Sequence, residues 1–155
     1  MIRAIRHVGL VVRNLERSLT FYRDFLGLEV GRQATEEGSY IDNVVGIPNV
    51  RVEWVKLKAP DGSLLELLQY HSHPSPVVFK NAPSNRLGCS HVAFTVANLQ
   101  TTYQALLANG FNCNSAPQIS PDGKVKVMYC HDPDGIILEL VEEMKGVNDV
   151  SEIAG

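Results

Sequence analysis

The sequence lacks the features of several large protein classes. No apolar run approaches the roughly 18 residues that a membrane-spanning helix needs, and the first residues, MIRAIRHVGLVV, contain no long apolar core followed by a cleavage site. We therefore expect a cytoplasmic protein with no membrane partner. Neither sign of charge dominates, because 14 Lys and Arg residues stand against 17 Asp and Glu residues, for a net charge of −3. This balance gives the chain no reason to bind nucleic acid.

Cysteine is also scarce, and its three positions, Cys89, Cys113 and Cys130, form no C-x-x-C pair. An odd number of widely spaced thiols favours a reducing compartment, in agreement with a cytoplasmic location. The chain has no G-x-x-x-x-G-K-[ST], G-x-G-x-x-G or G-x-S-x-G pattern. A nucleotide-binding protein and a serine hydrolase therefore find no support in the sequence.

What the chain does contain is an internal repeat. The segment HVGLVVRNL, which begins at His7, matches HVAFTVANL, which begins at His91, with an offset of 84 residues (7 to 91). The segment PDGSLLEL at Pro60 matches PDGIILEL at Pro133, with an offset of 73 residues (60 to 133). Two matches in the same order indicate a duplicated unit whose second copy is shorter in its middle.

Each copy has the same predicted order of elements: a strand, a helix and three further strands. β-Branched residues predict the first strand over 2–12 and over 90–96. Asn14 and Asn98 are the predicted N-caps of the helices that follow, and a glycine ends each helix. The remaining strands are predicted over 29–33, 50–57 and 64–70 in the first copy, and over 111–114, 124–130 and 136–141 in the second.

The two copies define the expected domain organisation and an α+β fold class. We predict a first βαβββ module over 1–70, a linker over 71–88, a second βαβββ module over 89–142 and a C-terminal tail over 143–155. The linker is rich in Pro, Ser and Asn, as surface loops are. Residues 36–49 are extra in the first copy and contain two glycines and a proline, so we interpret them as a loop over the site.

Each module places one histidine and one glutamate among apolar neighbours on its strands. Alternation puts His7 and Glu66 on strand faces in the first module, and His91 and Glu139 hold the equivalent positions in the second. A single strand histidine is more often a hydrogen-bonded structural residue, and a single glutamate commonly faces solvent. Four such residues in register favour a different interpretation from a single one. A buried carboxylate needs a compensating cation, and a pseudo-twofold axis would bring the two histidines and the two glutamates together. We predict that all four bind one divalent metal ion.

This ligand set favours one kind of chemistry. Two imidazoles and two carboxylates suit Zn, Ni, Co, Mn or Fe(II), and the site is neutral overall. A six-coordinate ion keeps two open positions for two vicinal oxygens of a substrate, such as an enediolate, and stabilises the charge that develops when a C–H proton leaves. Glu66 and Glu139 are the candidate catalytic bases, because a carboxylate beside the ion can detach and accept that proton. A ring-cleaving dioxygenase needs a third open position for O₂, which a fourth protein ligand occupies.

The repeated segments carry a resemblance to a known family. HVGLVVRNLERSLTFYRDFLGLEV, PDGSLLELLQY, HVAFTVANL and PDGIILELVEE resemble the vicinal oxygen chelate superfamily, also called the glyoxalase/bleomycin-resistance/dioxygenase superfamily, over about residues 5–142. The resemblance implies paired βαβββ modules that form an open, cup-shaped mixed sheet. It also implies that the first and last strands of a module are neighbours, which places His7 beside Glu66 and His91 beside Glu139, and that the protein forms a homodimer.

Within this superfamily, the His-Glu-His-Glu set is similar to that of glyoxalase I (lactoylglutathione lyase) and of metal-dependent epimerases. Val11 stands where the resemblance to glyoxalase I implies an arginine for the glutathione carboxylate, and Tyr70 stands where it implies an asparagine. These two departures do not favour glutathione, so we expect a metal-dependent isomerase, epimerase or lyase, either glyoxalase I-like or epimerase-like, with an unassigned small-molecule substrate. A metal-dependent ring-cleaving dioxygenase and a non-catalytic drug-binding protein stay open as alternatives, as do the roles of His71, His73 and Cys89.

Overall fold

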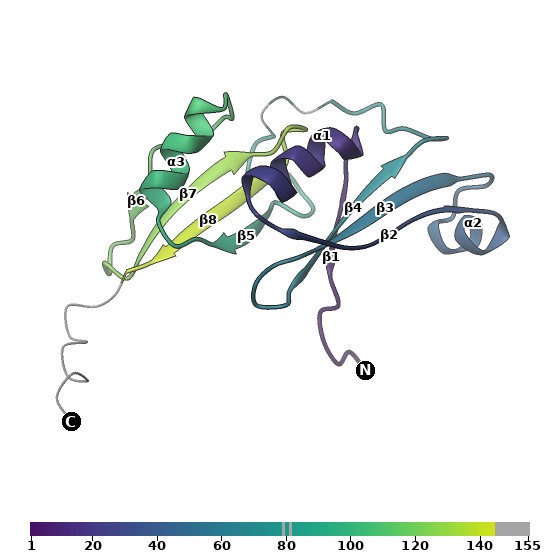
Figure 1. Ribbon diagram of the computed structural model, residues 1–155, viewed down its shortest axis with the longest axis horizontal. Helices are drawn as coiled ribbons and strands as arrows, with labels where there is room; N and C mark the ends of the chain where they lie inside the picture. The colour runs from purple at the N-terminus through teal and green to yellow at the C-terminus, as the bar shows by residue number, and fades with distance from the viewer. Residues whose placement is uncertain (79, 81, 145–155) are drawn as a thin grey trace. The chain divides into compact units, whose positions relative to one another are not determined.

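The computed structural model describes residues 1–78, 80 and 82–144 and divides the chain into two units, Met1–Val78 and Phe79–Gly155. Each unit contains one four-stranded sheet (Figure 1). The predicted C-terminal tail starts within the last strand of the second sheet, and its residues 145–155 lie outside the described part of the chain. None of the helices in the described residues is long and apolar enough to span a membrane.

The first unit consists of the strands β1 (Val8–Val11), β2 (Glu29–Glu37), β3 (Arg51–Lys58) and β4 (Leu64–Tyr70), the α-helices α1 (Leu15–Leu19) and α2 (Ser39–Val45), and the π-helix η1 (Thr20–Phe25). Its sheet has the order β1-β4-β3-β2. β1 runs parallel to β4, and the other neighbouring strands are antiparallel. The π-helix continues α1 directly, and the N–H of Leu26 at its end bonds to the carbonyl of Phe21 at 2.9 Å.

The second unit consists of β5 (His91–Thr95), α3 (Leu99–Ala108), β6 (Gln118–Ile119), β7 (Val125–His131) and β8 (Ile137–Glu143). Its sheet has the order β5-β8-β7-β6, with β5 parallel to β8 and the other pairs antiparallel, so it repeats the topology of the first sheet. The predicted α+β fold class of two βαβββ modules with open mixed sheets is therefore confirmed.

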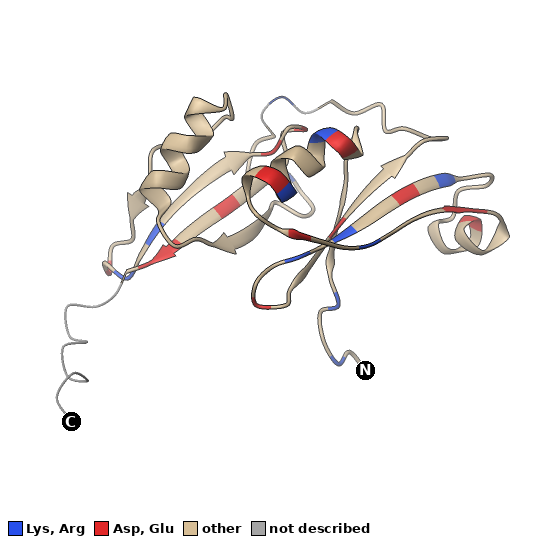
Figure 2. Cartoon of the chain, viewed as in Figure 1, with Lys and Arg blue, Asp and Glu red and all other residues tan. Residues whose placement is uncertain are grey.

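The predicted helix caps are also confirmed. Asn14 Oδ1 accepts a hydrogen bond from the Arg17 N–H at 2.8 Å, and Asn98 Oδ1 accepts one from the Thr101 N–H at 2.8 Å. Each bond satisfies one of the N–H groups that a helix leaves unpaired in its first turn. The helices differ in charge, because α1 carries acidic and basic side chains and α3 carries neither (Figure 2).

One face of each sheet is buried against the helix of its own unit. Leu67 of β4 and Leu140 of β8 occupy equivalent positions, and both are 0% exposed. Tyr22 and Leu106 on the helical side are buried to the same extent. Because side chains alternate along a strand, the residues next to these leucines in the sequence, which include Glu66 and Glu139, lie on the opposite face of each sheet.

The first strand is shorter than predicted. Its ladder with β4 starts at the pair of Val8 and Leu65, and β4 itself starts at Leu64. Residues 2–6 lie beyond that end of β4, so Ile2 is 94% exposed and Ile5 is 88% exposed. β-Propensity alone does not form a strand where no neighbour offers backbone groups.

The prediction that residues 36–49 form a loop is wrong, because β2 continues to Glu37 and α2 follows. Gly38 at φ 97° and Gly46 at φ 72° let the backbone enter and leave this short helix. The Asp42 carboxylate accepts the N–H groups of Asn49 and Val50 at 2.8 and 2.9 Å, which ties the end of α2 to the start of β3.

This helix covers part of one sheet face. Ile41 of α2 belongs to a buried cluster with Val52 of β3, against which Leu68 and Tyr70 of β4 pack. Leu68 and Tyr70 alternate with the buried side of β4 and share the face of Glu66. The segment therefore packs over one end of the face that carries Glu66.

The strand predicted over 111–114 is also absent from the described structure. Cys113 forms a single bridge with Cys130 of β7, and the edge strand is β6, two residues long. Pro117 stands between the bridge and β6, and it has no N–H to donate to a ladder. The proline accounts for the interruption.

Candidate metal centre

The first predicted pair is formed by His7, just before β1, and Glu66 on β4. His7 Nε2 lies 3.1 Å from Glu66 Oε2, and the two side chains are 27% and 13% exposed. The contact follows from the strand register, because Gly9 lies opposite Glu66 in the parallel ladder and His7 is two residues earlier on the same face. A partly exposed pair of this kind is accessible to a ligand.

The second predicted pair repeats the first. His91 Nε2 lies 3.1 Å from Glu139 Oε2, with side chains that are 30% and 24% exposed. Ala93 lies opposite Glu139 in the β5–β8 ladder, as Gly9 lies opposite the glutamate of the first unit. The structure thus brings the four predicted residues together as two pairs, each built at the same register of its own sheet.

Both pairs fit a divalent ion. Bonds of about 2.0–2.1 Å place two ligand atoms about 2.9 Å apart at a right angle and about 3.4 Å apart at the tetrahedral angle. The distance of 3.1 Å between Nε2 and Oε2 falls in that range in both pairs. Within residues 1–78, 80 and 82–144, no group of three or more His, Cys, Asp or Glu side chains is gathered for a metal ion. Each pair by itself therefore supplies two donors.

The surroundings of the first pair include a cation. Lys56 lies opposite Glu66 in the β3–β4 ladder, and its Nζ is 3.7 Å from Glu66 Oε1. The same Nζ lies 5.0 Å from the ring centroid of Trp54, within cation–π range. His7 Nδ1 is buried and has no hydrogen-bond partner among the described residues. Glu66 thus has a partner at each carboxylate oxygen, His7 at Oε2 and Lys56 at Oε1.

The residues that the described structure places in contact with the second pair carry no charge. Tyr129 lies opposite Glu139 in the β7–β8 ladder, and its hydroxyl is 3.4 Å from His91 Nδ1. Ser90 Oγ is 3.1 Å from the same nitrogen. Polar partners on one ring nitrogen hold the imidazole so that the other nitrogen can face an ion. In the described part of the chain, Glu139 forms no ion pair with Lys or Arg.

A second repeated contact, which the sequence reasoning missed, holds the helices to the last strands. Gln69 Oε1 of β4 accepts the N–H of Leu15 at 2.7 Å, and Glu142 Oε2 of β8 accepts the N–H of Leu99 at 2.6 Å. Residues 69 and 142 are related by the same offset as Glu66 and Glu139. A polar residue at the same repeat position on an apolar face was the signal available in the sequence.

Glu142 makes a further contact that its counterpart lacks. Its Oε1 lies 3.1 Å from Lys126 Nζ. The backbone N–H of Leu99 and then the Lys126 ammonium both stabilise the ionised form, so the pKa of the Glu142 carboxyl is lowered. The N-terminus of α3 is thus held by a charged group.

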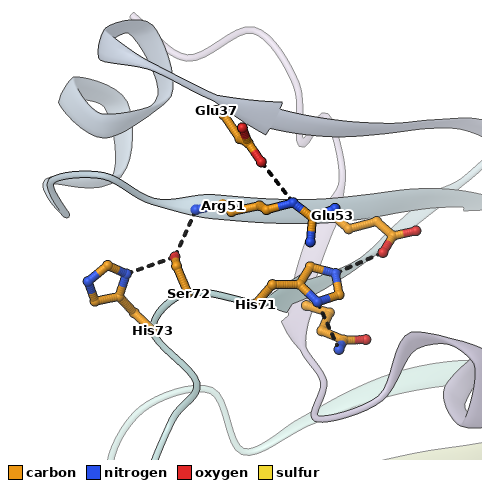
Figure 3. A network of polar contacts seen from close by, with 7 residues as sticks. Glu37, Arg51, Glu53, His71, Ser72 and His73 are labelled. Atoms are coloured by element: carbon orange, nitrogen blue, oxygen red, sulfur yellow. Dashed lines mark hydrogen bonds and ion pairs between the residues drawn. The ribbon is translucent and has the colours of Figure 1, made fainter.

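His71 belongs to this helix-anchoring contact and not to the metal pair. Its Nε2 lies 2.9 Å from Glu53 Oε2, and its Nδ1 lies 3.4 Å from Gln69 Nε2. Glu53 and Gln69 face each other in the β3–β4 ladder, on the side of the sheet opposite to Glu66. Figure 3 shows His71 and Glu53 turned toward each other in this network.

The remaining candidates also lie outside the pairs. His73 Nδ1 is 2.8 Å from Ser72 Oγ, which accepts the N–H of Arg51 at 2.8 Å (Figure 3). Cys89 is exposed, and its Sγ lies 3.8 Å from the carbonyl oxygen of His91. Burial raises the pKa of the Cys130 thiol to about 12, so this cysteine stays a neutral packed group.

Comparisons with known proteins identify the family and agree with the fold. The family model for the Glyoxalase/Bleomycin resistance protein/Dioxygenase superfamily matches residues 4–140. The uncharacterized protein YwkD of Bacillus subtilis is 26% identical over 145 residues, which cover 92% of this chain and 99% of that protein. The lactoylglutathione lyase of Schizosaccharomyces pombe is 25% identical over 146 residues, 90% of this chain and 47% of the lyase. The crystal structure of a glyoxalase family protein from Bacillus cereus has a TM-score of 0.85 and 26% identity, covering 94% of this chain and 97% of that one.

Proposed function

Because this chain belongs to the Glyoxalase/Bleomycin resistance protein/Dioxygenase superfamily, we propose that it is a divalent-metal-dependent isomerase, epimerase or lyase. The proposed reaction removes a proton from the carbon next to a chelated carbonyl of a small substrate. One observation carries the proposal: an imidazole Nε2 and a carboxylate Oε2 lie 3.1 Å apart at the same register of both sheets.

The proposed ligands are His7, Glu66, His91 and Glu139. A bound Zn, Ni, Co, Mn or Fe(II) ion supplies Lewis-acid polarisation of the substrate oxygens. The proposal requires the two pairs to converge on one ion, either within one chain or between the chains of a homodimer. The partial exposure of all four side chains, from 13% to 30%, supports a site that a substrate can reach.

The two glutamates have a second proposed role as the proton acceptors. A carboxylate oxygen beside the substrate carbon can take the proton and return it to the same or a neighbouring atom, which distinguishes an epimerase from other isomerases. The contacts of Ser90 and Tyr129 with His91 Nδ1 support this role for Glu139, because they fix the imidazole that Glu139 faces. The carboxylate can then move without disturbing its neighbouring ligand.

The substrate is proposed to be a small molecule, and two positions do not favour a glutathione adduct. Val11 is 51% exposed and lies on the face of β1 that carries His7, where it offers no donor to a carboxylate. Tyr70 packs against the apolar cluster under α2. Neither position provides the guanidinium or the amide that the resemblance to glyoxalase I implies there.

The ligand assignment is tested by titrating chelator-treated protein with Co²⁺ in a calorimeter. We expect His7→Ala, Glu66→Gln, His91→Ala and Glu139→Gln each to weaken Co²⁺ binding by about 100-fold or more, since removing even an indirect partner of a metal ligand costs about 10–100-fold. His73→Ala is the matched control, because it removes an imidazole that contacts Ser72 and neither pair. Unchanged Co²⁺ affinity in the two glutamate variants would contradict the proposal.

The reaction class is tested on the loaded protein with hemithioacetals, methylmalonyl-CoA and catechols. Solvent deuterium that enters a substrate carbon without O₂ consumption supports proton transfer. Oxygen uptake with a catechol would instead show a ring-cleaving dioxygenase, and tight ligand binding without metal or turnover would show a drug-binding protein. Light scattering of the same samples tests the proposed homodimer.

A further inference from the structure

The two metal-binding glutamates differ in the residue that faces each of them across the sheet. Lys56 faces Glu66, and Tyr129 faces Glu139. Lys56 Nζ is 3.7 Å from Glu66 Oε1, while His7 Nε2 is 3.1 Å from Glu66 Oε2. The first carboxylate therefore lies between an ammonium and an imidazole, whereas the second faces an aromatic ring.

A cation–π contact and partial burial keep the ammonium at this place. The Lys56 Nζ lies 5.0 Å from the ring centroid of Trp54, which occupies the same face of β3 two residues earlier. Only 23% of the Lys56 side chain is exposed, so its stem packs on the sheet and its head stays beside Glu66. The cation is held next to the pair and is still accessible.

The charge balance changes when an ion binds this pair. A divalent ion on Glu66 competes with Lys56 for the same carboxylate, and the two cations repel each other. Two glutamates neutralise a divalent ion, so the proposed four-ligand site is neutral without Lys56 and carries one positive charge with it. A partly buried charge without a partner is unfavourable, and an anionic group on the bound ligand would compensate it.

We propose that Lys56 is a specificity-determining residue that binds an acidic group next to the two chelating oxygens of the substrate. The inference rests on the proposed metal-dependent function. It links two equilibria, because Lys56 weakens metal binding when no anion is present and strengthens anion binding to the loaded site. If Lys56 had only a structural role, its loss would weaken metal binding, because Glu66 would be less well placed.

The test uses three probes of the same shape, oxalate, oxamate and oxamide, which present two vicinal oxygens with two, one and no negative charges. Binding to the Co²⁺-loaded full-length protein is measured by calorimetry, and the Co²⁺ absorption spectrum verifies that the ion stays bound. We expect wild type to prefer oxalate over oxamate and oxamide. In Lys56→Met the preference for oxalate over oxamide should fall about tenfold, as for loss of one charge-assisted hydrogen bond. Lys56→Arg should keep the preference.

The second readout is Co²⁺ binding to the metal-free variants. Lys56→Met should bind Co²⁺ severalfold more tightly than wild type. Lys126→Met is the matched control, because it removes a Lys–Glu ion pair of 3.1 Å on the other face of the second sheet and should change neither equilibrium. An unchanged oxalate preference, or weaker Co²⁺ binding in Lys56→Met, would overturn the inference. If wild type bound no Co²⁺ at all, the proposed function itself would fail.

Discussion

The two units use the same strands to build the same pair of side chains, yet they differ in the residues that face the pair, in the length of one edge strand and in the presence of α2. In both units, the ladder between the first and the last strand sets the register of the histidine and the glutamate. The edge strand on the antiparallel side of the sheet has 9 residues in the first unit (β2) and 2 in the second (β6). In the described residues, a helix like α2 packs on the open face of the first sheet only. The comparison teaches that the parallel ladder between the first and the last strand determines the pair, and that the other side of each sheet is free to vary.

The residues that differ between the units include those that face each glutamate. The facing residue is Lys56 in one unit and Tyr129 in the other, and the small residue opposite the glutamate is Gly9 or Ala93. None of these substitutions changes the distance of 3.1 Å between the donor atoms. The backbone ladder therefore preserves the distance between the two donor atoms, while the neighbouring side chains differ in charge and in size.

The largest expected effect tests whether the two cores are equivalent. Leu67 and Leu140 are 0% exposed at matched positions of β4 and β8. Leu67→Ala and Leu140→Ala should each lower the free energy of unfolding by about 3 kcal/mol, from lost burial and the cavity that remains. Denaturant unfolding followed by circular dichroism measures both. A loss below about 1 kcal/mol in either variant would show that the two sheets are not packed alike.

A smaller effect should separate the two helix anchors by their response to pH. The pKa of Glu142 is lowered in the folded protein, so its contribution is fully present above the ordinary glutamate value of about 4.5 and is lost as the pH falls through the lowered value. Gln69 has no such dependence. We expect the stability of Glu142→Gln to fall less than that of wild type between pH 5 and pH 3, as measured by thermal unfolding across that range. Parallel pH curves would show that the carboxylate does not anchor α3 as an ion.

The smallest effect is expected from a substitution of Gly9, which lies opposite Glu66 in the parallel ladder. A Cβ added at Gly9 would lie 3.3 Å from Leu68 Cδ1 and 3.8 Å from Glu66 Oε2, so only a flexible side-chain end must move. Gly9→Ala should change the stability by less than about 1 kcal/mol, because reduced backbone entropy of the unfolded chain offsets that shift. Co²⁺ affinity should change less than about threefold, as the second unit already has Ala93. A large loss of Co²⁺ binding would show that the first pair needs space that the second does not.

The repeat in the sequence was sufficient to predict the order of elements in each module and to select the four residues, while the neighbouring of the first and last strands came from the family resemblance. Two offsets identified both modules, and Asn14 and Asn98 marked both helix starts, because these features are local or periodic. The contact of Lys56 with Glu66 could not be predicted, since it depends on which residues face each other across a ladder, and alternation alone does not give that register. The helix within 36–49 was missed because Gly38 and Gly46 indicate a loop, although they stand at its two ends.

The π-helix η1 has a consequence for how the two halves of this chain could diverge. The chain has one residue more between Asn14 and Gly27 than between Asn98 and Gly110. A π-turn closes on the fifth residue back instead of the fourth, so it accommodates the additional residue while the cap and the terminal glycine keep their places. An insertion in one copy of the duplicated gene thus stays confined to a bulge of the helix, and natural selection can lengthen or shorten that segment without disturbing the sheet beneath it.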